Sequence, residues 1–510
     1  MENEHQPAGE KLADRATAPE RKTRLQLTRR VTLTRATSPG HPATVTLAGG
    51  KLLAGIQVPT AALHITAALS VVCLDWLAGA VAGYTWFHAL VALILVAYSL
   101  IAWLICDPLV FFLGFSLFAT LAPMVTSDFY IELGNRISEQ GVSGFPSGAT
   151  TRLAFYCLIY FLIIYIALRT GAKRLQRTAA DLRIETFTKI TYALHAAAIV
   201  GGVGLLLVHG SPLLRREDRF EYWATLPDIF NRYPFLLAIL SFLTVCIVAV
   251  RPTRTSRWWT IGLLGSSAVV LVLFSEKFTG LFSIFVLSVT AWYAASIYHR
   301  DAPVRPLRLL ALCSGVGVIL LGLAAGGYIV FYGYNIQTVW AKLADRALAL
   351  HGHVWFGMDR ALQAGAANGP ISALFPAPGA GGLTGIQQMM YLVAPDDFVD
   401  RMIAQGVRFA NVGFPLPVWV LGYGWAIPYF VLAGALTGAV LTYLLWGVAR
   451  LRPITILLAL NLFRQMTNAF LVGDVSDLYK PLMIATLILA VIDLGYAFTR
   501  KRLRRRQGAG

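Results

Sequence analysis

The chain consists mainly of apolar runs that are long enough to cross a lipid bilayer, separated by shorter polar linkers. A transmembrane helix needs about 20 predominantly apolar residues, because each residue adds about 1.5 Å along the helix axis. Runs of this kind recur from residue 57 to residue 499. They predict twelve transmembrane helices, near residues 57–80, 84–105, 108–126, 153–171, 189–208, 233–250, 258–274, 279–298, 309–333, 427–449, 453–472 and 480–499.

The linkers between these spans alternate between basic and non-basic. Nine Lys or Arg residues precede residue 57, six lie within 169–189, and six lie within 500–506. Short loops rich in Lys and Arg stay on the cytoplasmic side of a membrane. The charge pattern therefore predicts that both termini are cytoplasmic and that three longer linkers lie outside, namely 127–152, 209–232 and 334–414.

The predicted fold class is an all-α polytopic membrane protein with about 12 transmembrane helices and a large late periplasmic loop that contains short helices. Apolar residues at three- and four-residue spacing predict one helix over 336–364, and a second short helix is predicted at 395–408. Residues 365–385, rich in Gly, Ala and Pro, are predicted to be loop. Pro and Gly residues within 412–430 are compatible with a re-entrant segment.

These boundaries divide the chain into five segments. The N-terminal segment lacks the apolar stretch of a cleavable signal peptide, so we expect it to remain as a disordered tail. The segments are a disordered basic cytoplasmic tail (1–56), a membrane domain of nine spans (57–333), the large periplasmic loop (334–414), a membrane domain of three spans (415–499) and a second basic cytoplasmic tail (500–510).

Composition supports a membrane protein and argues against a nucleic-acid partner. Apolar residues make up 57% of the chain and charged residues only 14%, whereas a soluble domain carries about 25% charged residues. The net charge of +17 is concentrated in the predicted cytoplasmic linkers, where it orients the spans and contacts anionic lipid headgroups. The five cysteines all fall in or beside apolar spans, so we expect no disulfide framework and no thiolate metal site.

The outer linker 209–232 concentrates side chains that are suited to a charged glycan. Arg219 offers a planar fork of donors for phosphate oxygens, and Asp218 can accept a proton from a sugar hydroxyl. Tyr222 and Trp223 offer flat faces for sugar rings. An ordinary solvated loop with local ion pairs is the competing interpretation.

Two further cations are hard to explain by membrane orientation alone. Lys277 lies in a tight outer turn, where the charge rule favours no cation. Arg464 lies inside an apolar span, and a charge at that depth normally faces a polar cavity or a partner. Arg408 approaches the membrane at the end of the large loop. The competing interpretation of Lys277 is a Glu–Lys pair reaching the headgroups.

The large loop contains a cluster of cationic and titratable residues. On one continuous helix, Arg346 and His353 share a face and could point at one cavity. A histidine titrates near neutral pH and can take a proton from an attacking hydroxyl. The His351-Gly-His353 sequence has no third ligand at a convincing spacing, so no metal site is expected.

Several of these features are similar to those of a known family. The chain resembles the bacterial oligosaccharide repeat-unit polymerases, the Wzy family that builds O-antigen and exopolysaccharide. The segment HGSPLLRREDRFEYW (209–223), the turn EKFTGLF (276–282) and the ten residues between Arg346 and Gly357 are similar to features of that family. The earlier outer loop departs from the Arg-to-Gly pattern, because Phe230 stands where a Gly would follow Arg219.

The resemblance implies a reaction at the outer face of a bacterial inner membrane. A growing glycan would move from undecaprenyl diphosphate to the terminal hydroxyl of an incoming lipid-linked unit, without metal, nucleotide or other cofactor. It implies a flippase and a chain-length regulator as partners. The roles that follow are diphosphate binding for Arg219, Lys277 and Arg464, diphosphate or sugar binding for Arg346 and Arg408, and a general base in His353 or, second, Asp218.

Two other functions remain open on the sequence. An O-antigen ligase uses a similar donor and transfers the chain to lipid A-core, and its sequence pattern would be nearly the same. A secondary transporter or flippase also commonly has twelve spans. No internal repeat is visible, and transport does not require a long late outer loop.

Overall fold

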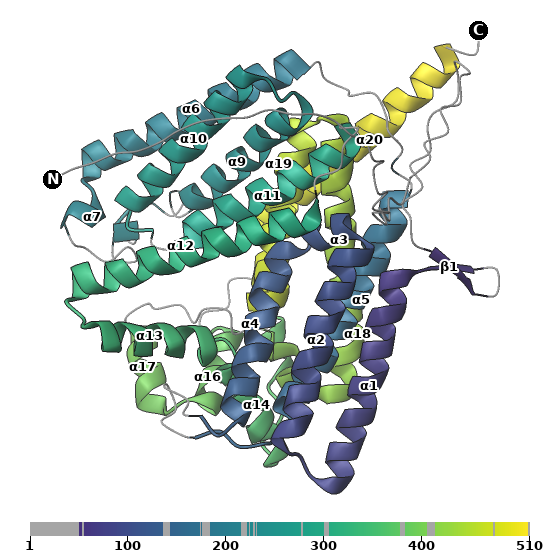
Figure 1. The fold of residues 1–510 in the computed structure, drawn as a ribbon, viewed down its shortest axis with the longest axis vertical. Coiled ribbons are helices and arrows are strands. Elements are labelled where there is room, and N and C mark those ends of the chain that lie inside the picture. Colours follow the sequence, from purple (N-terminus) through teal and green to yellow (C-terminus); the bar gives the residue numbers. More distant parts are fainter. Residues whose placement is uncertain are drawn as a thin grey trace, which may run out of the picture. The chain divides into compact units, whose positions relative to one another are not determined.

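The part of the chain that the structure describes is helical apart from one short hairpin at its start (Figure 1). The hairpin pairs β1 (Gly50–Leu53) with β2 (Ile56–Pro59). A computed structural model describes residues 50–53, 56–135, 143–173, 175, 184–215, 222–223, 225–227, 230, 232–276, 279–299, 305–377, 383–404, 414–472 and 475–507.

Ten of the described helices are long and apolar enough to cross a membrane, so the chain is a multi-pass membrane protein. They fall in α1 (Thr60–Ala82), α2 (Trp86–Cys106), α5 (Ala149–Lys173), α6 (Ile184–His209), α9 (Tyr233–Val250), α10 (Arg254–Leu273), α11 (Thr279–His299), α12 (Pro306–Tyr332), α18 (Leu416–Arg450) and α19 (Pro453–Thr467).

The other two predicted spans have different structures. The span predicted at 108–126 is split at Gly114 into α3 (Pro108–Leu113) and α4 (Phe115–Glu132). The span predicted at 480–499 begins α20 (Pro481–Gln507), whose apolar part is Pro481–Ala497. A π-helix, η2 (Asn468–Val472), and a 3-10 helix, η3 (Val475–Tyr479), connect α19 to α20. A short helix, α7 (Pro212–Arg215), follows α6.

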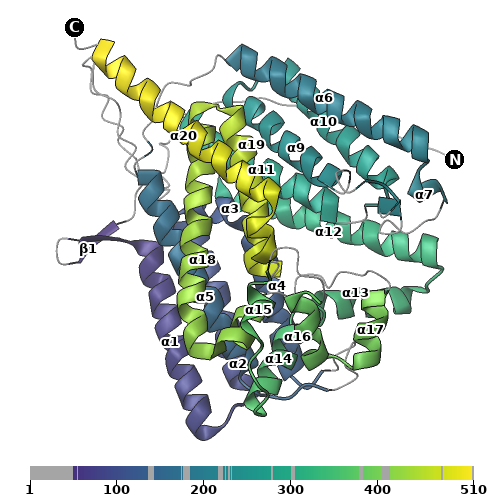
Figure 2. The ribbon, with the colours of Figure 1, turned by 180° about the vertical axis from the view of Figure 1, so that it is seen from behind.

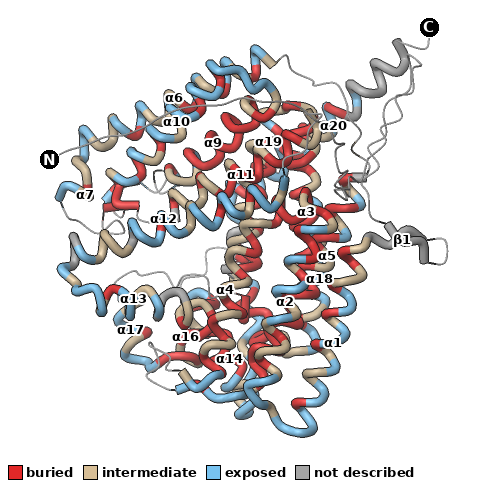
Figure 3. Tube along the Cα trace, in the orientation of Figure 1, coloured by how far each residue is buried: buried red, intermediate tan, exposed pale blue. Residues whose placement is uncertain are grey.

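Helices α5 and α18 pack side by side next to α1 and α2, and α5 is the most buried of the ten (Figures 2 and 3). Two glycines allow the close approach. A Cβ at Gly434 would lie 3.0 Å from the Cβ of Ile163, and one at Gly438 would lie 2.6 Å from the Cβ of Ala167. Small residues four apart bring membrane helices into contact in this way.

Buried ion pairs mark the two ends of α5. At one end Arg169 contacts Asp107, at 2.6 Å, and nearby spans are joined by a pair between Arg452 and Asp493. Both arginines belong to the basic linkers, so we call this the basic end of the bundle. The opposite end, which we call the loop end, holds Arg152 of α5 paired with Asp359 of the large loop.

The described part of the large loop contains five helices, which gather beside the ends of α4, α5 and α18 (Figure 1). The short helix predicted at 395–408 is confirmed over its first part by α17, and α15 and α16 were not predicted. The five are α13 (Ile336–Leu348), α14 (His353–Gln363), α15 (Ile371–Leu374), α16 (Gly385–Val393) and α17 (Asp396–Ala404).

The prediction of one continuous helix over 336–364 was wrong. The helix stops at Leu348 and restarts at His353. Gly352 lies in the gap, where its N–H donates to the Ser127 hydroxyl at 2.9 Å and a Cβ would come within 2.4 Å of the Asp128 nitrogen. Docking onto α4 therefore overrides the local helical pattern.

The segment 412–430 also differs from the predicted span boundary. From Leu416 onwards it belongs to α18, which is broken at Gly422, where φ is +75°. Glycine adopts this backbone conformation without the steric cost that a Cβ brings. The break divides α18 into a short first part and a long second part that packs on α5.

Candidate functional site

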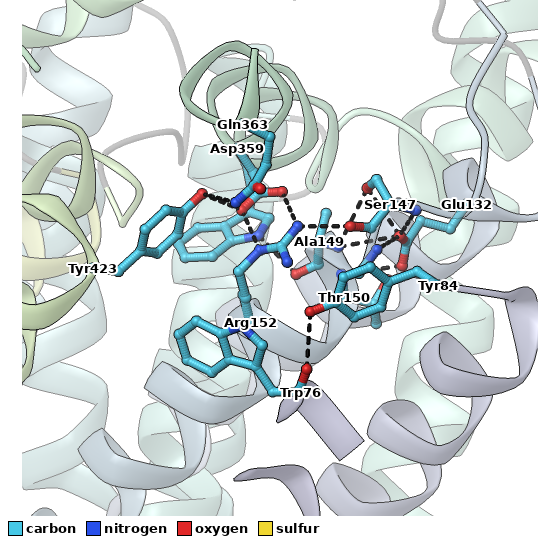
Figure 4. Close-up of polar contacts among 12 residues, drawn as sticks. Trp76, Tyr84, Glu132, Ser147, Ala149, Thr150, Arg152, Asp359, Gln363 and Tyr423 are labelled. Carbon is cyan, nitrogen blue, oxygen red and sulfur yellow. Dashed lines mark hydrogen bonds and ion pairs between the residues drawn. The ribbon is translucent and has the colours of Figure 1, made fainter. Parts of the chain in front are cut away.

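A polar cluster is centred on the N-terminal turn of α5 at the loop end (Figure 4). Its first component is Glu132, whose Oε1 accepts hydrogen bonds from the backbone N–H groups of Ser147, Gly148 and Ala149, while Oε2 accepts from the N–H of Thr150. These distances lie between 2.6 and 3.1 Å. A carboxylate satisfies the free donors at a helix N-terminus and is stabilised there by the helix dipole. Glu132 therefore fixes the start of α5.

One turn further along α5, Arg152 forms a bidentate ion pair with Asp359 of α14. Its Nε donates to Oδ1 at 2.7 Å and its Nη2 donates to Oδ2 at 2.6 Å, while Nη2 also donates to the Ser147 carbonyl at 2.7 Å. Arg152 is 1% exposed and Asp359 is 0% exposed. The pair joins the large loop to a central span across about 200 residues of chain.

Aromatic rings enclose the arginine on two sides. The guanidinium carbon lies 5.1 Å from the ring centre of Tyr84 and 5.9 Å from that of Tyr423, within the range of cation–π attraction. Tyr423 donates its hydroxyl to Asp359 at 2.8 Å, and Gln363 donates to that hydroxyl at 3.1 Å. The Tyr423 carbonyl accepts from the Tyr156 hydroxyl at 2.6 Å, which ties α18 to α5 just after the break at Gly422.

A His–Asp pair lies beside this cluster, between α1 and α2. The Nδ1 of His88 is 2.8 Å from Oδ1 of Asp75, and the Thr151 hydroxyl donates to Oδ2 at 3.1 Å. The side chains of His88 and Asp75 keep 15% and 12% of their surface exposed. The rings of His88 and Tyr84 meet edge to face at 5.6 Å, so the pair adjoins the ring that covers Arg152.

The cluster separates into a closed and an accessible part. Both donors of the arginine fork are engaged by Asp359, so the closed part holds the loop in place. The accessible part comprises Gln363 and Tyr423, which are neutral donors and acceptors, and the two titratable side chains of the His–Asp pair. Such groups bind sugar hydroxyls and accept protons.

The predicted base His353 is the first residue of α14, and it is 3% exposed. Its Nδ1 lies 2.7 Å from the carbonyl of Leu350. A carbonyl only accepts, so Nδ1 carries the hydrogen and Nε2 has the lone pair that a base requires. The predicted partner Arg346 lies on α13, beyond the break at Gly352, so the two do not share one helix face as expected.

Arg464 lies in the last α-helical turn of α19, just before the π-helix η2. Its guanidinium carbon is 4.5 Å from the ring centre of Phe235 on α9. On the same helix, Asn461 donates to the Thr486 hydroxyl of α20 at 2.8 Å. The charge therefore sits where three helices meet and the helical geometry changes, and π-helical turns of this kind recur at functional sites.

The two predicted sugar-stacking rings pack against other rings. Trp223 stacks on Phe274 with ring centres 5.0 Å apart, and Tyr222 lies 5.9 Å from the same ring. Both side chains are buried. The remaining predicted residues, Asp218, Arg219, Lys277 and Arg408, lie outside the described residues.

Several residues of the cluster were not selected from the sequence. Glu132, Arg152, His88 and Tyr423 occur singly near predicted span ends, where polar residues are ordinary. One signal was available, because Arg152 is a cation at the non-basic end of a span, as Lys277 is. Its partner Asp359 is about 200 residues away, and no local pattern connects them.

Among the described residues, no group of three His, Cys, Asp or Glu side chains is placed to hold a metal ion. In comparisons with known proteins, residues 380–487 match the model of a family of unknown function (DUF6418). The matched part runs from the end of the large loop through α18 and α19 into α20, and includes Tyr423 and Arg464. No curated protein and no solved structure matches the chain.

Proposed function

We propose that this protein polymerises undecaprenyl-diphosphate-linked oligosaccharide repeat units at the outer face of the bacterial inner membrane, yielding O-antigen or exopolysaccharide. The observation that carries the proposal is the docking of the large loop onto the loop end of the bundle through Arg152 and Asp359. It brings polar side chains of the loop and of the spans together at the loop end of the bundle, opposite the basic linkers. A lipid-linked glycan needs such a site at the membrane surface.

The proposed topology has twelve spans with both termini cytoplasmic. α3 and α4 together form the third span, and the apolar part of α20 forms the last. The loop end is then periplasmic, and it holds the large loop. The ion pairs of Arg169 and Arg452 fall on the cytoplasmic side, where the charge rule favours arginine.

In the proposed reaction the donor already carries a diphosphate leaving group. The protein must neutralise that group, align a sugar hydroxyl and accept its proton. Arg464 is the described cation that we assign to the diphosphate, with Arg219, Lys277, Arg346 and Arg408 as the further candidates. His353, with Asp218 second, is the base that the sequence favours. Turnover by purified protein should therefore survive EDTA.

A deletion strain tests the reaction. Cells without the protein should keep single repeat units, either lipid-linked or attached once to lipid A-core, and should lose long chains. A ligase would instead leave long chains on the lipid carrier with none on the surface lipid, and that result would contradict the proposal. Lipid-linked repeat units that accumulate on the cytoplasmic leaflet would instead point to a flippase.

Arg464 provides the sharpest test of the assigned residues. A charge-assisted hydrogen bond to a diphosphate contributes about 1.5–3 kcal/mol, so Arg464→Ala should lower turnover about ten- to a hundredfold. Arg464→Lys should also be impaired if the contact is bidentate. Arg401→Ala, which alters an exposed arginine of α17, is the matched control at equal membrane expression. Wild-type turnover in Arg464→Ala would reduce that residue to a structural role.

A further inference from the structure

Among the ion pairs of the described spans, the His88–Asp75 pair is the one whose basic partner is a histidine, and it lies between two membrane helices. Asp75 lies within candidate span α1, two turns before its end, and His88 lies in the first turn of candidate span α2. Ionisable residues inside membrane spans are costly and are retained mainly where they function. The pair therefore calls for a chemical role.

The hydrogen bonds define which ring nitrogen is basic. The carboxylate oxygen accepts from Nδ1, so the proton of the neutral imidazole is on Nδ1 and the lone pair is on Nε2. Thr151 holds the other carboxylate oxygen, which fixes the orientation of Asp75. A base held in one tautomer by an oriented carboxylate is the arrangement used for proton removal in many hydrolases.

The environment of the pair distinguishes it from a purely structural contact. Arg152 and Asp359 are almost completely enclosed, whereas 15% of the His88 side chain is exposed. His353, the base expected from the sequence, is 3% exposed and bonded to a backbone carbonyl. A carboxylate stabilises the imidazolium that forms when a base takes up a proton, and a neutral carbonyl does so less.

We propose that His88 is the general base that activates the acceptor hydroxyl, with Asp75 and Thr151 as its positioning residues; this inference rests on the proposed function. The proton of the acceptor sugar hydroxyl moves to Nε2 of His88, and the hydroxyl oxygen forms a bond to the anomeric carbon of the donor. The bond between that carbon and the diphosphate breaks, and its electron pair leaves with the undecaprenyl diphosphate. The imidazolium then releases the proton to water.

The test uses the purified full-length protein with lipid-linked donor and acceptor in detergent micelles. His88→Ala should lower kcat about 10²- to 10⁴-fold, with KM for the donor changed less than threefold, because a base acts in the transition state. Added imidazole should restore part of the lost rate. Asp75→Asn should lower kcat at least tenfold, because an amide stabilises the imidazolium poorly.

His64→Ala is the matched control, because His64 lies on the same helix pair and contacts the Tyr98 hydroxyl instead of a carboxylate. It should keep kcat within about twofold of wild type. Gel-filtration profiles show whether each variant is folded. If His88→Ala aggregates, the kcat of Asp75→Asn tests the proposal in its place.

Three results would overturn the assignment of His88. They are wild-type kcat in folded His88→Ala, a loss of kcat that imidazole does not restore in the folded variant, and wild-type kcat in folded Asp75→Asn. Failure of the wild-type protein itself to elongate the lipid-linked acceptor would overturn the proposed function instead, so the two failures are distinguishable.

Discussion

Arg152 shows how one residue can connect a membrane span to a distant loop. Its guanidinium is paired with Asp359 and bonded to the Ser147 carbonyl, with rings of Tyr84 and Tyr423 on either side. Taking two charges out of water is expensive, and good geometry with additional hydrogen bonds is needed to offset that cost. The pair therefore makes docking of α14 depend on both partners.

Removing one partner should destabilise the protein strongly. Arg152→Ala leaves the Asp359 carboxylate buried without its cation, and breaking a buried pair costs about 3–5 kcal/mol. The midpoint temperature of heat-induced aggregation of the variant in detergent should be clearly lower than that of wild type. The double variant Arg152→Met, Asp359→Leu should recover part of that loss, because no charge remains buried.

The matched control for this experiment is Arg251→Ala. Arg251 contacts Glu185 at 3.2 Å, but the two side chains are 53% and 61% exposed. Exposed pairs contribute about 0–1 kcal/mol, so this variant should behave as wild type. An equal, small effect of Arg152→Ala and Arg251→Ala would show that the buried pair does not hold the loop.

At the scale of single residues, the sequence indicated unusual positions better than it indicated partners. Arg464 is recognisable from its depth in an apolar span, and the structure places it against Phe235. Arg152 became meaningful only when Asp359, which is 207 residues away in the chain, was brought against it. Long-range pairing of this kind leaves no local periodicity.

At the scale of helices, the apolar pattern predicted where spans lie but not where they break. Ten of the twelve predicted spans correspond to long apolar helices. Helices break at Gly114, Gly352 and Gly422, within stretches that the sequence pattern predicts to be continuous helix or loop. Each break depends on packing or on a backbone conformation that an apolar pattern does not encode.

Gly352→Ala tests the most informative of these breaks. The φ of Gly352 is −100°, so an alanine suits the backbone, and the obstacle is the Asp128 backbone at 2.4 Å from the new Cβ. Overpacking of this kind costs about 1–3 kcal/mol. When membranes that contain the variant are treated with a protease, cleavage within the large loop should be faster than in wild type.

Gly495→Ala provides the control for that experiment, because a Cβ at Gly495 in α20 would meet nothing within 4 Å. Alanine is favoured over glycine in a helix, so the control should be neutral or slightly stabilising. Unchanged proteolysis in Gly352→Ala would show that α13–α14 does not need close contact with α4.

The turn between α13 and α14 should also respond to pH. Burial, with a smaller effect of neighbouring His353, lowers the pKa of His351 below its ordinary value of 6.5. An undocked loop then binds more protons than a docked one, so docking is fully stable above about pH 6.5 and weakens as the pH falls below it. Hydrogen exchange in 346–364 should accelerate from pH 7.5 to pH 5.5, after correction for the intrinsic rate.

His351→Gln should flatten this pH response while leaving exchange at pH 7.5 similar. A variant of an exposed histidine on α6, His209→Gln, should retain the response of the wild type. If exchange in His351→Gln accelerates as much as in wild type, another group controls docking of the turn.

At the scale of the whole molecule, charge predicted which linkers share a side of the membrane, and the structure shows which polar contacts lie at each end of the bundle. Arg169 and Arg452 form ion pairs at the basic end, while Arg152, and the contact between Tyr479 and the Pro376 carbonyl, join the large loop to the loop end. How the spans pack around α5 could not be predicted, because every span is apolar on several sides. Close packing depends on small residues such as Gly434 and Gly438.

The last prediction concerns the membrane orientation of this arrangement. We expect the loop at Ala366 to be periplasmic and the C-terminal end at Gln507 to be cytoplasmic, because this places the basic linkers inside. Single cysteines at these two positions, in a background without the five native cysteines, should differ in their labelling by a thiol reagent in intact spheroplasts. A membrane-impermeant thiol reagent should label position 366 and should label position 507 only after permeabilisation. Labelling of position 507 in intact spheroplasts, or protection of position 366, would contradict the orientation and move the proposed site to the cytoplasmic side, where lipid-linked units have not yet been translocated.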